Sequence, residues 1–176
     1  MLDRLRQFAS IVEQITEWTG RLISWLVLFM VVVMFIVVVL RYMFNVGWIA
    51  MQESVTYAHV LVFMLGTAFA MKHNQHVRVD IFYQRYSPSG RAWINIFGSV
   101  FLLLPVAVYI FSSSYEYVLD SISLKESSRE AGGLPFVYLL KLQMLIMAGL
   151  LVLQALAEII RNAFIVVGIE QEGEHG

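Results

Sequence analysis

Four long apolar runs separated by short polar stretches dominate the pattern of this chain of 176 residues. Residues 22–40 carry no formal charge between Arg21 and Arg41, and Ser24 is the one clearly polar side chain among them. At 1.5 Å per residue the run reaches about 28 Å, close to the roughly 30 Å of a bilayer's hydrocarbon core. A signal peptide would have a shorter apolar region followed by small residues, so we predict an uncleaved transmembrane helix.

Three further runs predict three more spans, and the second of them contains a proline near its middle. Pro105 deprives a carbonyl four residues earlier of its helical donor, so we expect a kink that packs against protein rather than lipid. In the last run Lys141 lies one turn inside, where its stem can reach the interface, and Glu158 and Arg161 are spaced to pair. The predicted spans are about 21–43, 49–71, 92–117 and 136–160.

Ahead of the first span, the pattern of residues from about 2 to 18 predicts an amphipathic helix. We favour this interpretation over a disordered polar tail. Plotted at 100° per residue, one face is apolar and carries Leu5, Phe8, Val12 and Ile15. The opposite face carries Asp3, Arg6, Ser10, Glu13 and Glu17. We expect this helix to lie in the plane of the membrane interface.

The distribution of Lys and Arg predicts the orientation. Both termini and the loop of residues 72–91 share one side of a four-span chain, and that side holds eight of the 12 cationic residues. The other side, which includes the loop of residues 118–135, holds four. Because positive loops stay in the cytoplasm, we predict an all-α integral membrane protein of one membrane domain, residues 1–176, with both termini cytoplasmic and loop 118–135 periplasmic.

Composition narrows the class of protein further. Hydrophobic residues make up 59% and charged residues 14%, against roughly 45–50% and 25% in soluble domains, and the mean hydropathy is +0.72. The net charge of −1 argues against a nucleic-acid partner. The chain has no cysteine, which excludes disulfides, thiolate zinc sites and cysteine nucleophiles. We predict no cofactor and no enzymatic activity.

The few polar residues in or beside the spans are the candidate sites. His73 and His76 lie three apart, but the loop supplies no convincing third metal ligand, and we interpret both as interfacial. Glu53, at the start of the second span, invites a transport role, but we favour a structural pair with Arg41 near the outer surface. We interpret His59, deeper in the span, as a buried residue hydrogen-bonded to a neighbouring helix.

Glycines mark two further candidate positions. Gly66 and Ala70 lie four apart in the second span, a spacing that lets membrane helices approach closely. Gly132 and Gly133 precede Pro135 in the loop before the last span and predict a turn there. That loop is either a plain connector or a docking surface for an extracytoplasmic partner.

The order of these features resembles a known family. The residues that carry the resemblance are Trp48 followed by Glu53, the run His76-Val77-Arg78-Val79-Asp80, and Gly133-Leu134-Pro135, within "GWIAMQESVTYAHVLVFMLGTAFAMKHNQHVRVDIF" and "ESSREAGGLPFVYLLKLQM". They resemble the small membrane subunit (DctQ-type) of tripartite ATP-independent periplasmic, or TRAP, transporters. Many relatives have a proline early in the last span, where this chain reads "LLKLQMLIM", which leaves the local helix shape open.

The resemblance implies a location in the bacterial inner membrane and a set of partners. A large membrane subunit carries the sodium and substrate sites and moves as an elevator, and a periplasmic binding protein transiently delivers an organic acid. The small subunit braces the large one, and Arg78 and Asp80 would fix the cytoplasmic loop or touch it.

Two other functions remain open at this point. A haem-binding membrane anchor of a redox complex would use His59 with a methionine such as Met34 or Met147 as axial ligands. A stand-alone small transporter or channel would need a polar path, for which the spans offer His59, Thr56, Thr67 and Ser99.

Overall fold

The computed structural model describes residues 2–73, 83 and 85–168, and for residues 2 and 3 only the backbone. The described residues are helical apart from turns and short loops, and no strand occurs among them. His76, Arg78 and Asp80, on which part of the family resemblance depends, lie outside the described residues.

Four helical rods, each long and apolar enough to cross a membrane, make up the described part of the chain. One rod is composite, because α4, a π-helical turn η1 and α5 follow one another without a break from residue 88 to residue 123. The described elements are α1 (Leu2–Phe44), α2 (Ile49–Lys72), α4 (Pro88–Gly98), η1 (Ser99–Leu103), α5 (Leu104–Ser123) and α6 (Val137–Val166). The prediction of an all-α membrane protein is confirmed at this level.

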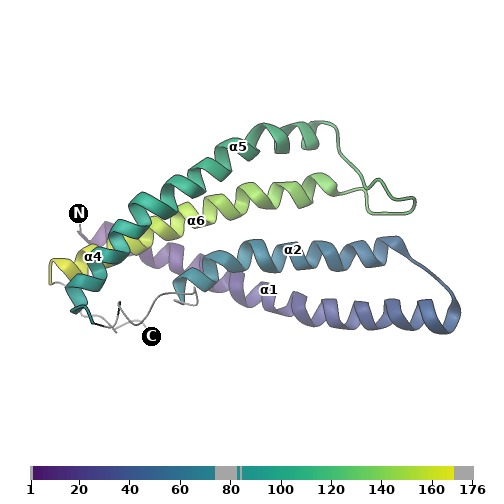
Figure 1. Ribbon diagram of the computed structural model, residues 1–176, viewed down its shortest axis with the longest axis horizontal. Coiled ribbons are helices and arrows are strands. Elements are labelled where there is room, and N and C mark those ends of the chain that lie inside the picture. Colours follow the sequence, from purple (N-terminus) through teal and green to yellow (C-terminus); the bar gives the residue numbers. More distant parts are fainter. Residues whose placement is uncertain (1, 74–82, 84, 169–176) are drawn as a thin grey trace.

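The rods lie side by side in the order α1, α2, α6, α5 at the right-hand end of the molecule, which we call the loop end (Figure 1). This end holds the α1–α2 turn and the α5–α6 loop. At the opposite end, the terminal end, α1 crosses over to α6, while α4 also packs against α6 (Figure 1). Helix α2 therefore lies between α1 and α6 and contacts both.

The first rod differs from the sequence prediction. Instead of an interfacial helix of about residues 2–18 followed by a span, α1 runs from Leu2 to Phe44 without interruption. No proline breaks it, and Gly20 serves a close contact, since a Cβ there would lie 2.5 Å from Cγ of Phe69 on α2. The buried positions of its first half recur every three or four residues, as in coiled coils: Ala9, Val12, Thr16, Gly20 and Ile23.

The predicted apolar face of the N-terminal half is consequently divided between two surroundings. Val12 packs with Ala9 against Ala157 and Ile160 of α6. Phe8 and Ile15 remain exposed. Tertiary packing therefore uses only part of the face that periodicity identified, because α6 covers a narrow strip of the helix.

The proline in the third rod is accommodated by the π-helical turn before it. In η1 the backbone N–H of Leu104 donates to the carbonyl of Ser99, five residues back, so the chain widens just where Pro105 lacks an N–H. Ser99 and Ala107 are buried, whereas Phe101 is exposed. The expected packing of this kink against protein therefore holds on the side that faces α6 and not on the outer side.

Candidate functional site

Glu53 joins the start of α2 to the α5–α6 loop at the loop end. Its Oε2 accepts a hydrogen bond of 2.6 Å from the backbone N–H of Leu134, and its Oε1 accepts one from the hydroxyl of Ser128. The loop closes on itself as well, because the N–H of Ser128 donates to the carbonyl of Leu134 at 3.1 Å. We call Glu53, Ser128 and Leu134 the Glu53 clamp.

The two glycines of the loop have different roles beside the clamp. Gly132 has φ of +81°, a left-handed backbone conformation that residues other than glycine adopt only at an energetic cost. At Gly133 a Cβ would lie 2.6 Å from Cβ of Ser128 and 2.8 Å from Oε1 of Glu53. Gly133 is thus required by the close approach of the loop to the clamp, and the exposed Pro135 follows it just ahead of α6.

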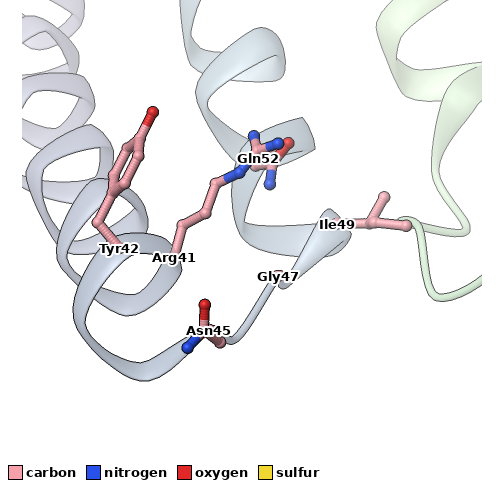
Figure 2. Close-up of a pocket in the computed structure, with 6 residues that line it drawn as sticks. All are labelled: Arg41, Tyr42, Asn45, Gly47, Ile49 and Gln52. Atoms are coloured by element: carbon pink, nitrogen blue, oxygen red, sulfur yellow. The ribbon is translucent and has the colours of Figure 1, made fainter.

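The predicted pair of Arg41 and Glu53 is wrong. Both residues lie in the described part of the chain, where they form no ion pair, because the carboxylate of Glu53 turns toward the loop instead. Arg41 lines an open pocket of about 650 Å³ together with Tyr42, Asn45, Gly47, Ile49 and Gln52. Figure 2 shows the Arg41 side chain extending toward Gln52 on α2.

The α1–α2 turn shapes that pocket. Asn45 has φ of +55°, and the N–H of Val46 returns to the carbonyl of Leu40 at 3.0 Å, which ends α1. Asparagine tolerates this left-handed conformation better than most residues. Trp48 then begins α2 as its N-cap residue and is exposed.

An ion pair holds the other part of the loop. Glu126 accepts hydrogen bonds from Nζ of Lys141 on α6 and from the hydroxyl of Ser121, the latter at 2.6 Å. The Lys141 ammonium lies 3.9 Å from the ring centroid of Tyr117. The hydrogen bond from Lys141, followed by that from Ser121, holds the pKa of Glu126 below its ordinary value. Lys141 therefore pairs with a carboxylate at this end rather than extending free.

His59 does not lie as predicted, whereas Gly66 does face a neighbouring helix. His59 is exposed on α2 rather than buried, and its contact is with the ring of Phe63, 4.7 Å between centroids. Within the described residues it makes no hydrogen bond to another helix. Gly66 faces α1, where a Cβ would lie 3.5 Å from Ile23, an ordinary contact, so its small size is not required there. Ala70 is half-buried.

At the terminal end, carboxylates of α1 bind cations of other helices. Glu17 contacts Nζ of Lys72 and Nε2 of His73, both at 3.0 Å, where α2 ends. His73 is therefore hydrogen-bonded to a carboxylate, and the described residues contain no group of three or more potential metal ligands. Near the same end, Arg161 of α6 contacts Glu13 of α1 at 3.8 Å. Arg161 also pairs with Glu158 of its own helix, as the spacing of these two residues predicts.

The interhelical contacts of Gln154 and Asn162, two buried polar residues on α6, were not predicted from the sequence. Thr16 of α1 donates to Oε1 of the fully buried Gln154 at 3.0 Å, and Asn95 of α4 donates to Oδ1 of Asn162 at 3.1 Å. A signal was present in the sequence, because these polar positions recur every four residues within an apolar helix: Gln154, Glu158 and Asn162. Such a stripe faces protein rather than lipid.

These features define a class: a multi-pass helical membrane protein whose polar side chains mainly join its helices to one another. Comparison with known families identifies it further. The model of the DctQ component of tripartite ATP-independent periplasmic transporters matches residues 30–164, and the chain belongs to that family. The chain is thus a transporter component, and the resemblance seen in the sequence is confirmed.

A curated relative agrees with this assignment. The chain is 30% identical over 91 residues to a putative TRAP transporter small permease protein of Haemophilus influenzae, an alignment that covers 52% of this chain and 56% of the relative. The chain therefore spans about half the length of that relative. No solved structure matches.

Proposed function

We propose that this chain is the accessory subunit that braces the large, elevator-type membrane subunit of a TRAP transporter. The large subunit performs sodium-coupled uptake of an organic acid, which a periplasmic binding protein delivers. The small subunit binds neither sodium nor substrate. Membership of the DctQ family supports the identity of the assembly, and the use of the polar residues supports the accessory role.

The observation that carries the accessory role is how the buried and half-buried polar groups of the described residues are used. Glu53 holds a loop, Gln154 binds Thr16 of α1, and Asn162 accepts a hydrogen bond from Asn95 of α4. A transport path needs polar groups that face a water-filled cavity near the middle of the membrane. Groups committed to joining helices are poorly suited to that task, which favours bracing over conduction.

The outward position of His59 argues against the haem-binding alternative. A haem held between two helices of one chain needs an axial histidine that points between them. His59 instead lies on an exposed face of α2, against Phe63. This alternative therefore has no support from the geometry.

The proposal is tested by expressing the chain with its genomic neighbours. A larger multi-span protein should co-purify with it, and proteoliposomes that contain both should take up an organic acid when sodium and the binding protein are supplied. Failure to co-purify any larger membrane protein would overturn the assignment. Uptake by this chain alone would overturn the accessory role.

We also propose that the chain lies in the inner membrane with both termini and loop 72–91 in the cytoplasm, where Arg78 and Asp80 fix that loop or touch the large subunit. The excess of Lys and Arg on this side supports the orientation. The natural absence of cysteine makes a direct test simple. An impermeant maleimide applied to spheroplasts should label Ser127→Cys and should label Ser10→Cys only after the membrane is opened; the reverse pattern would refute the orientation.

A further inference from the structure

The outward face of α2 carries polar side chains at the depth of the membrane. Gln52, Thr56, His59 and Phe63 follow one another at spacings of three or four residues, so they share one side of the helix. Thr56, His59 and Phe63 are exposed, and Gln52 is half-buried beside the Arg41 pocket (Figure 2). We call these four residues the α2 stripe.

His59 lies close to the middle of the span. It is about 15 Å along the helix from Ile49, and the whole of α2 measures about 36 Å at 1.5 Å per residue. An ionisable side chain at that depth is costly when it faces lipid. Its exposure within this chain therefore requires an explanation.

Thr56 and His59 also differ from several hydroxyl-bearing residues of the spans. The hydroxyls of Ser54, Thr67 and Ser112 bond carbonyls three or four residues back in their own helices, at 2.7, 2.8 and 3.1 Å. Within the described part of the chain, Thr56 and His59 make no hydrogen bond at all. Hydrocarbon offers no partner for them, so lipid is an unsuitable neighbour for this face.

The stripe occupies the centre of a broad surface. Helix α2 contacts α1 on one side and α6 on the other, so a helix laid along the stripe would also meet its two neighbours (Figure 1). Interfaces concentrate binding energy at such central positions. In membranes, hydrogen bonds of Thr and His side chains are a recognised means of joining helices.

We propose that the α2 stripe is the docking surface for a transmembrane helix of the large subunit, which offers hydrogen-bonding groups opposite Thr56 and His59. This inference rests on the proposed function and adds the face by which the chain binds its partner. The 3-4 spacing of the stripe fits a partner helix that crosses α2 at about 20°.

Variants at the stripe test the inference through the recovery of the large subunit. Thr56→Val combined with His59→Leu should lower the ratio of large to small subunit after purification about three- to thirtyfold, the effect of one interhelical hydrogen bond or two. His59→Gln, which still forms hydrogen bonds, should stay near the unmodified protein. Ser112→Ala, which removes an exposed hydroxyl from α5, is the matched control and should change nothing.

The isolated small subunit provides the second measurement. Because the stripe is exposed, the double variant should melt within about 2 °C of the unmodified chain when the large subunit is absent, by the usual insensitivity of surface positions. Reduced recovery with unchanged melting supports docking. Unchanged recovery of the large subunit overturns the inference. A reduced recovery also overturns it if a lower melting temperature of the isolated double variant fully accounts for the loss.

Photocrosslinking identifies what covers the face. A benzophenone amino acid placed at position 63 should form an adduct with the large subunit, whereas the same group at the exposed position 101 on η1 should not. An adduct with a second copy of this chain, or with lipid alone, would overturn the inference. If the unmodified chain recovers no large subunit at all, the proposed function itself fails. If the unmodified chain recovers the large subunit and the stripe variants recover it equally well, this inference alone fails.

Discussion

The carboxylate of Glu53 on α2 accepts a hydrogen bond of 2.6 Å from the backbone N–H of Leu134, 81 residues later in the chain. This contact links the start of one predicted span to the loop that precedes another. It explains why an acidic residue and a Gly-Leu-Pro sequence occur together in this protein: the carboxylate satisfies backbone and hydroxyl donors that the loop cannot satisfy alone.

Glu53→Ala should therefore destabilise the loop end. It leaves the Leu134 N–H and the Ser128 hydroxyl without an acceptor, at a cost of about 1–3 kcal/mol. The melting temperature in detergent should fall, and proteolysis within residues 124–135 should accelerate. Glu53→Gln, which keeps an acceptor oxygen, should lose less. Glu116→Ala, at an exposed position of α5, is the control, and equal melting of the two alanine variants would contradict the role of the clamp.

Gly133→Ala and Gly132→Ala should weaken the same loop to different degrees. A methyl group at position 133 would overlap Ser128 and Glu53, so the clamp must open to admit it. At position 132 the cost is the left-handed backbone alone, about 1–2 kcal/mol. Hydrogen exchange at the Leu134 amide should be fastest in the Gly133 variant. Slower exchange there than in the Gly132 variant would refute the steric argument.

Thr16→Val tests the buried contact between α1 and α6. The change keeps the volume of the side chain but removes the donor to Oε1 of Gln154, and Nε2 of Gln154 already has no partner within the described residues. We expect a loss of about 1–3 kcal/mol. Gln154→Leu combined with Thr16→Val should recover part of that loss, because no buried amide then remains at this contact. A double variant no more stable than Thr16→Val would contradict this account.

Glu126 should make the loop sensitive to acid. Because Lys141 holds the pKa of Glu126 below its ordinary value of 4.5, the carboxylate stabilises the loop fully above that value. The stabilisation is lost as the pH falls from 4.5 through the lowered pKa of the folded protein. Proteolysis of residues 124–135 should accelerate over that interval in the unmodified chain. Glu126→Gln should abolish this acid step, and its persistence would assign it to another group.

Much of the architecture was predictable because membrane insertion depends on the chain's own hydropathy. A run such as residues 22–40 must form a helix in hydrocarbon, where every backbone group has to be satisfied within the segment. The family resemblance was likewise visible in short motifs such as Gly133-Leu134-Pro135. Neither the number of spans nor the family resemblance depends on which helices pack against each other.

The errors arose where a side chain's direction mattered. Arg41 and Glu53 both lie near the loop end, but proximity along the membrane normal does not say toward which neighbour each side chain turns. His59 was predicted to be buried because it is polar in a span, whereas the chain leaves it exposed. The cost of that exposure is a property of the chain alone, and the docking proposed above would remove it.

The sequence by itself determined the class of protein, the number of spans and the family, since these follow from hydropathy, charge and local motifs. Only the tertiary structure decided that α1 is one continuous helix, that Glu53 holds the loop rather than Arg41, and that the α2 stripe faces outward. The physical reason is that periodicity specifies a helix and its faces. The packing of α6 and α2 against α1 then selects which faces are buried and which remain exposed.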